Sequence, residues 1–135
     1  MSEMNILDWA VAYIKYKDSV HGKIKSIDVD NSHDKVEVVF KDETKATYLC
    51  KDKLEELNVS SLKNEKVVCL NKKDNLNWLI SNWETIKDKS CIFLFVNIKQ
   101  SENWAINPHI HSSVTDKSAL KSGLKALFES IPEAN

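Results

Sequence analysis

The sequence predicts a mixed α/β (α+β) fold, with a single mixed sheet of about five strands and helices on both faces. Three observations predict it. Residues 5–16 and 117–131 carry apolar side chains at helical spacing. Residues 66–70 and 91–96 are almost continuously apolar, which is typical of parallel strands covered on both faces. Residues 20–50 contain shorter segments of alternating character, which is typical of an antiparallel meander.

The N-terminal half is expected to contain one helix followed by three strands. Over residues 5–16, apolar side chains recur at i, i+3, i+4, i+7 and i+8, and Asn5 is placed to cap the first turn. Strands are expected over residues 20–29, 35–41 and 45–50. Because polar turns separate them, consecutive strands should pair antiparallel.

The C-terminal half is expected to alternate helices with the two buried strands. A short helix over residues 51–58 precedes the first buried strand. A longer helix, capped by Asp74 or Asn75 and ending near Lys87, connects it to the second. A strand, a helix and another buried strand make a right-handed βαβ unit. Residues 98–115 are expected to be irregular, and the last helix follows them.

The full predicted order is α-β-β-β-α-β-α-β-α. Over roughly residues 5–71, the first six elements resemble in topology the core of the restriction-endonuclease-like nucleases. This resemblance implies an acid on the second strand and a Glu-x-Lys pattern on the third, which together hold a divalent metal. Glu43 and Lys45 match the short pattern, but Glu43 falls in a predicted turn and not within the third strand, so a solvated hairpin is expected there rather than a metal site. The candidates for the earlier acid are Asp28, Asp30 and Asp34.

The length predicts one domain, residues 1–135. The composition limits the kinds of binding and catalytic site that this domain can form. The chain has 19 lysines, no arginine, 20 acidic residues and a net charge of −1. Arginine supplies the planar fork that binds phosphates, carboxylates and guanine edges, so lysine must act here as a point charge. A nucleic-acid partner is therefore not expected. Two glycines and two prolines also argue against a Gly-rich phosphate loop or a Pro-rich linker.

Cysteine usage predicts a reducing, cytoplasmic location. Cys50, Cys69 and Cys91 form an odd set without Cys-x-x-Cys spacing, and each lies in an apolar run. Buried free thiols explain this pattern best. No signal peptide is expected at the N-terminus, and no apolar run approaches the ~20 residues of a membrane helix, so no membrane partner is expected.

Polar side chains follow both buried strands. Asn71 and Asn97 come at the carboxyl ends, where open α/β sheets bind ligands. The segment that leaves this edge contains Trp104, His109 and His111, and these five residues are the candidate ligand-binding residues. Asparagine is also common at strand ends, and Trp104 could instead cover the core with its N–H bonded.

Two histidines suggest a weaker metal site. In an extended chain, His109 and His111 would face the same side. Asp116 could be a third ligand or an acceptor behind the histidines. A plain surface role explains the same residues, because zinc needs three or four ligands.

The sequence therefore predicts a non-enzymatic binding or interaction module, which recognises a protein or small-molecule ligand at the carboxyl-end crevice. No catalytic residue or cofactor is indicated, because no nucleophile elbow, phosphate loop or dinucleotide fingerprint is present. The alternative is a metal-dependent hydrolase, including a diverged restriction-endonuclease-like nuclease, so enzyme status stays open. Four tryptophans and amphipathic terminal helices also leave a homodimer open.

Overall fold

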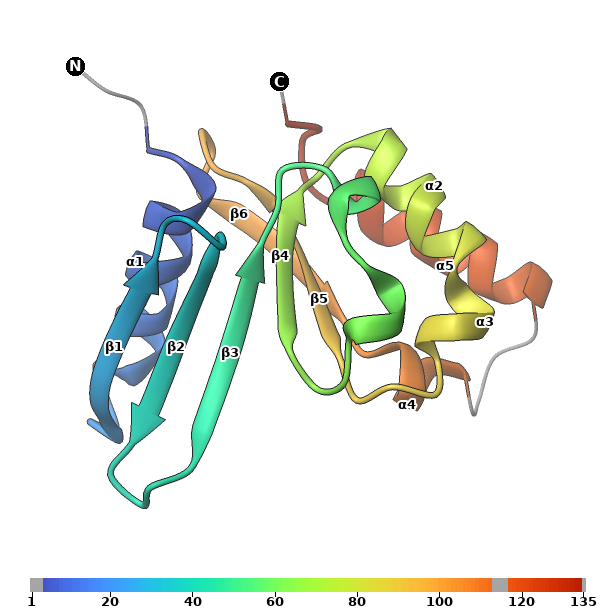
Figure 1. The fold of residues 1–135 in the computed structure, drawn as a ribbon. Coiled ribbons are helices and arrows are strands. Elements are labelled where there is room, and N and C mark those ends of the chain that lie inside the picture. Colours follow the sequence, from blue (N-terminus) through green and yellow to red (C-terminus); the bar gives the residue numbers. More distant parts are fainter. Residues whose placement is uncertain (1–3, 113–116, 135) are drawn as a thin grey trace.

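A mixed sheet of six strands forms the centre of the computed structural model, which describes residues 4–112 and 117–134 (Figure 1). The strands are β1 Ile24–Asp30, β2 Lys35–Phe40, β3 Lys45–Cys50, β4 Lys66–Leu70, β5 Ile92–Asn97 and β6 Glu102–Ile106. They lie in chain order across the sheet. β1, β2 and β3 pair antiparallel, β4 and β5 continue the sheet in parallel with β3, and β6 returns antiparallel to β5. The predicted fold class is confirmed, with one strand more than expected.

Helices cover both faces of this sheet (Figure 1). They are α1 Ile6–Asp18, α2 Lys73–Ser81, α3 Trp83–Ile86, α4 Pro108–Ser112 and α5 Lys117–Glu129, with 3₁₀ turns η1 Leu54–Glu56 and η2 Val59–Ser61. α1 packs on one face, whereas α2, α3 and α5 pack on the other. None of the helices in the described residues is long and apolar enough to cross a membrane.

Successive side chains of the central strands point to opposite faces of the sheet and so contribute to two separate hydrophobic cores. In β5, Phe93 and Phe95 enter the core beneath α2, α3 and α5. Leu94 and Val96 enter the core beneath α1. Because both faces are covered, an apolar side chain is favoured at every position, which explains the continuous apolar run over residues 91–96.

Both ends of α1 are fixed by carboxylate and amide side chains. The Asp8 backbone N–H donates to Asn5 Oδ1 at 2.8 Å, which confirms the predicted cap. At the other end, an Asp18 carboxylate oxygen accepts the backbone N–H groups of Lys23 and Ile24 at 2.7 and 3.2 Å. Gly22, with φ of 57°, allows the sharp turn that leads from α1 into β1.

Asn75 ties the η1 turn to the start of α2. Its Oδ1 accepts the Leu54 N–H, and its Nδ2 donates to the carbonyls of Asp52 and Leu70, each at 2.8 Å. The prediction that Asp74 or Asn75 caps this helix is wrong, because α2 begins at Lys73 without a side-chain cap. The Asn75 side chain instead forms hydrogen bonds with three buried or half-buried backbone groups, two of them near η1 and one at the end of β4. Local sequence does not predict these partners.

Two predicted helices are shorter than expected. Residues 51–58 form only the η1 turn, and η2 follows it. The helix expected to reach Lys87 divides into α2 and α3 at Asn82, where ψ is 9°. The Asn82 side chain donates to the Trp78 carbonyl at 2.8 Å. Such local side-chain bonds compete with the helical ladder and account for the break.

The largest departure from the predicted fold follows β5. Residues 98–115 were expected to be irregular, but β6 turns back and pairs with β5, placing Trp104 opposite Phe95 and Ile106 opposite Phe93. Trp104 and Ile106 are buried, while their strand neighbours are exposed. β6 therefore forms a half-covered edge strand, and α4 follows it.

All three cysteines are buried and free, as the sequence predicted. Burial raises the pKa of the Cys50 thiol to about 12, and the Asp34 carboxylate adds to the effect. Burial also raises the pKa of Cys69, and burial together with the Glu65 carboxylate raises that of Cys91. Each thiol therefore stays protonated in the folded protein to a higher pH than an exposed thiol does.

We expect the native thiols to resist alkylation at pH 8. Iodoacetamide reacts with the thiolate, and the rise of the Cys50 pKa from 9.0 to about 12 lowers the thiolate fraction of that residue about 1,000-fold. The pKa values of Cys69 and Cys91 are raised in the same direction. Iodoacetamide labelling followed by intact mass should be slow for the native protein and fast for the same protein in guanidinium chloride. Stability should also fall as the pH rises above about 9, because unfolded thiols ionise first and the unfolded state then binds fewer protons. Rapid native labelling of all three thiols would contradict this expectation.

Candidate functional site

Three of the candidate ligand-binding residues meet at the carboxyl ends of β4 and β5. The Asn71 backbone N–H donates to the Val96 carbonyl at 2.8 Å, and the Trp104 indole N–H donates to Asn71 Oδ1 at 2.8 Å. The Trp104 ring stacks on Phe95 with centroids 4.3 Å apart. Asn71, Asn97 and Trp104 are only 0%, 4% and 6% exposed. The alternative in which Trp104 covers the core with its N–H bonded is therefore confirmed.

The chain's own C-terminal segment, from the last turn of α5 onward, lies against these asparagines. Asn71 Nδ2 donates to the carbonyls of Phe128 and Pro132 at 3.2 and 3.3 Å. Asn97 Nδ2 donates to the Pro132 carbonyl at 3.0 Å, and the Ala134 N–H donates to the Asn71 carbonyl at 2.9 Å. Ligand binding by Asn71, Asn97 and Trp104 stays a prediction, and a ligand at this edge would have to replace these contacts.

The two candidate histidines lie at the opposite end of the sheet. β6 pairs Glu102 with Asn97 but Ile106 with Phe93, so the chain has returned toward the start of β5 before α4 begins. The expectation that His109 and His111 lie beside Asn97 is therefore wrong. The physical reason is the β5–β6 hairpin, which replaces the irregular segment that was expected.

The extended backbone that would place His109 and His111 on the same side is also absent. His109 and His111 lie in α4, not in an extended chain, and positions two apart on a helix are separated by about 200° around its axis. The His109 ring lies against the backbone of Lys87, with Nδ1 3.0 Å from the carbonyl oxygen. Asp116 and the side chain of His111 lie outside the described residues. Within the described part of the chain, no group of three or more His, Cys, Asp or Glu residues could hold a metal ion.

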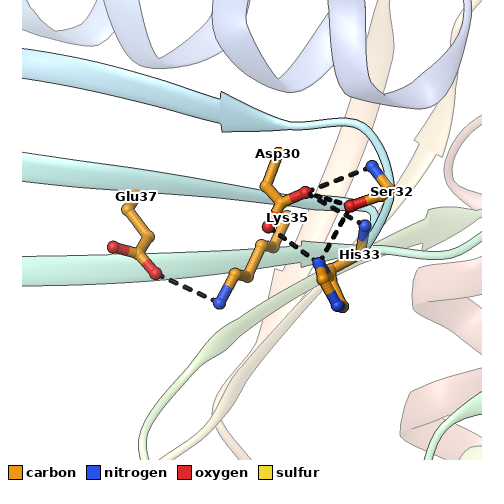
Figure 2. A network of polar contacts seen from close by, with 5 residues as sticks. All are labelled: Asp30, Ser32, His33, Lys35 and Glu37. Carbon is orange, nitrogen blue, oxygen red and sulfur yellow. Dashed lines mark hydrogen bonds and ion pairs between the residues drawn. The ribbon is translucent and has the colours of Figure 1, made fainter.

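Asp30, one acid implied by the nuclease resemblance, is engaged in its own turn. Its carboxylate accepts the backbone N–H and the hydroxyl of Ser32, at 3.1 and 2.7 Å (Figure 2). The second oxygen lies 2.9 Å from His33 Nδ1. The Ser32 and His33 hydrogen bonds hold the pKa of Asp30 below its ordinary value. Lys35 and Glu37 form a separate ion pair along β2, at 3.2 Å. The hydrogen bonds among Asp30, Ser32 and His33 stabilise the turn between β1 and β2.

Two further residues of that resemblance, Asp34 and Glu43, lie at opposite ends of β2. Asp34 precedes β2, whereas Glu43 follows it, and six strand residues span roughly 20 Å. Asp34 pairs with Lys51 at 2.8 Å, and Glu43 pairs with Lys25 at 3.0 Å. Glu43 also sits in the turn before β3, with φ of 71°. Asp34 and Glu43 therefore do not form one two-carboxylate site.

A groove between α1 and the sheet contains a cavity of about 320 Å³, which no local sequence pattern predicted. We call it the α1 groove. Tyr13, Ile14 and Lys17 of α1 form one wall. Its floor and opposite wall come from the sheet residues Phe40, Tyr48, Lys66, Ile92, Leu94 and Ala105.

The groove exists because the buried stripe of α1 ends before the helix does. The last buried residue of the helix is Ile14, and the final turn continues with Lys15, Tyr16 and Lys17, all exposed. No large apolar side chain from this turn covers the sheet, so Phe40, Tyr48 and Ile92 stay half-buried. The result is an apolar floor with access from solvent.

Lysine ammonium groups surround this floor. Lys66 Nζ lies 3.3 Å from Tyr48 Oη and 5.2 Å from the centre of the Tyr48 ring. Lys17 Nζ lies 5.3 Å from the centre of the Tyr13 ring. Lys23 lines the same groove, and among the described residues none of these three lysines has an acidic partner within 4.0 Å. The arrangement places positive charge beside an apolar surface.

One sequence signal could have pointed to this site. Lys66 opens the otherwise apolar strand β4 and shares a sheet face with Val68 and Leu70. A lysine at an inward position of a buried strand is unusual, because burial disfavours its charged form. The position of the groove itself depends on where α1 ends over the sheet, which no local pattern reveals.

Comparison with known proteins gave no matching family model, no matching curated protein and no matching solved structure.

Proposed function

We propose that this protein is a non-enzymatic binding module whose ligand site is the α1 groove. The observation that carries the proposal is the half-buried apolar floor of Phe40, Tyr48 and Ile92 beneath a cavity of about 320 Å³. Small-molecule sites are mostly apolar, concave and about 300–1,000 Å³ in volume, with a few polar groups that fix orientation. The groove combines these properties at the small end of that range.

The carboxyl-end crevice supports a ligand less well than the α1 groove does. Asn71 and Asn97 already donate to carbonyls of the C-terminal segment. The groove needs no such displacement. The alternative of a metal-dependent hydrolase has less support, because β2 separates Asp34 from Glu43 and the described residues contain no group of three or more His, Cys, Asp or Glu that could hold a metal ion.

The proposal includes a cytoplasmic location, which three buried free thiols support because thiols persist in reducing compartments. A small-molecule ligand fits the size of the groove better than a protein partner does, because a standard protein interface buries about 800 Å² on each side. A homodimer remains compatible with binding at this site.

Replacing Ala105 with tryptophan should block the groove without unfolding the protein. Ala105 is exposed on β6 and lines the groove, so an indole there would fill the cavity. Binding of the neutral apolar probe N-phenyl-1-naphthylamine, followed by its fluorescence, should fall at least about tenfold. The matched control is Ala126→Trp on the exposed side of α5, which should bind like the wild type. No binding by the wild type, or equal binding by both variants, would contradict the proposed site.

A further inference from the structure

We propose that the ligand of the α1 groove is a small amphipathic carboxylate, with its apolar body on the sheet and its carboxylate beside Lys66. This inference rests on the proposed function and adds the chemical class of the ligand. Three features of the groove support it: the position of Lys66, the balance of charge around the rim and the composition of the floor.

Lys66 has hydrogen-bonding capacity that its described neighbours do not use. It lies between Tyr48 of β3 and Ile92 of β5 in the sheet register, and it is half-buried. An ammonium group has three N–H donors, and the Tyr48 hydroxyl is the acceptor that it meets here, at 3.3 Å. A half-buried cation is stabilised most strongly by an anionic acceptor, so a ligand carboxylate suits this position.

The groove carries a local positive charge within a chain whose net charge is −1. Lys17 and Lys23 add two ammonium groups near the rim, and the exposed His21 lies beside them. Asp18 also lines the groove, and its negative charge offsets one of the three lysine charges. Lys23 also interacts electrostatically with Asp42, which lies outside the groove lining. Positive charge still exceeds negative charge among the lining residues. This asymmetry attracts an anion and disfavours a cation.

The floor requires an apolar body next to the charge. Phe40, Ile92 and Leu94 present hydrocarbon, while Tyr13 and Tyr48 present aromatic surface. A free inorganic anion would leave this surface in contact with water, whereas an alkyl or aryl group would cover it. The cavity of about 320 Å³ favours a small ligand over a peptide.

Three probes with the same ten-carbon chain separate charge from apolar contact: decanoate, 1-decanol and decyltrimethylammonium. Each should be titrated at pH 7.5 against the protein loaded with N-phenyl-1-naphthylamine, and displacement should be followed by fluorescence. Decanoate should bind at least about tenfold more tightly than decanol, and decyltrimethylammonium should bind most weakly. In Lys66→Met, decanoate affinity should fall to that of decanol, while decanol affinity stays unchanged.

The matched control is Lys45→Met, which removes an exposed lysine outside the groove and should leave all three affinities unchanged. Lys66→Gln, which keeps a polar side chain, replaces Lys66→Met if circular dichroism shows that the methionine variant is unfolded. Equal binding of the three probes by the wild type overturns the carboxylate inference but leaves the apolar groove intact. Unchanged decanoate binding in a folded Lys66 variant overturns the role of Lys66. Absence of binding by every apolar probe means that the proposed function itself fails.

Discussion

Replacing Asn71 with leucine should lower the free energy of unfolding by about 2–4 kcal/mol, because a buried polar group that loses its partner costs about 1–3 kcal/mol. Asn71 is 0% exposed, and its side chain serves three partners: the Trp104 indole N–H and the carbonyls of Phe128 and Pro132. Leucine has similar bulk but can bond with none of them. Urea unfolding followed by tryptophan fluorescence measures the loss.

The matched control is Asn77→Leu, which makes the same change at an exposed position of α2. Its stability should stay within about 0.5 kcal/mol of the wild type. Asn71→Leu should also speed hydrogen exchange at the Ala134 N–H, which donates to the Asn71 backbone carbonyl. An Asn71→Leu protein as stable as its control would show that these bonds contribute nothing to folding.

Phe95→Ala should be the most damaging of the proposed substitutions, with an expected loss of about 3–5 kcal/mol. The Phe95 ring is 0% exposed and stacks on Trp104 with an interplanar angle of 9°. Alanine would leave a cavity between the sheet and the helices on that face, in addition to the lost apolar burial. Because domains are stable by only about 5–15 kcal/mol, the unfolding midpoint in guanidinium chloride should fall sharply.

Phe95→Leu is the comparison for this prediction, because it retains most of the buried hydrocarbon. Its loss should be smaller, about 1–2 kcal/mol. Near-ultraviolet circular dichroism should show a changed tryptophan environment in both variants, since each removes the stacked ring. Equal stability losses in the two variants would mean that cavity volume at this position has no energetic weight.

Local patterns were sufficient to predict most of the sheet. The bounds of β3 and β4 agree with the predicted residues 45–50 and 66–70, because polar segments sharply limit both runs. β6 was missed because it is only five residues long, with Trp104 and Ile106 as its two inward positions. Its pairing with β5 supplies the stabilisation that this short pattern does not reveal.

The convergence of Asn71 and Asn97 was predictable from their position after neighbouring parallel strands. What covers them was not predictable, because the acceptors include the backbone carbonyls of Pro132 and Glu133. Every residue has such a carbonyl, so sequence gives no signal for this docking. The α1 groove was missed for a related reason: it depends on the register between a helix and a sheet formed from distant segments.

Chain order in the sheet gives assembly a natural direction during synthesis. Each strand pairs only with its neighbours in sequence, so β2 to β6 can each add to an edge that already exists as translation proceeds. The amides of Asn71 and Asn97 acquire their last acceptors only after Pro132 has been made. Until then, the Asn71 and Asn97 side chains lack these acceptors, which lie about 35 to 60 residues further along the chain. Completion of this edge is therefore coupled to the emergence of the C-terminal segment from the ribosome.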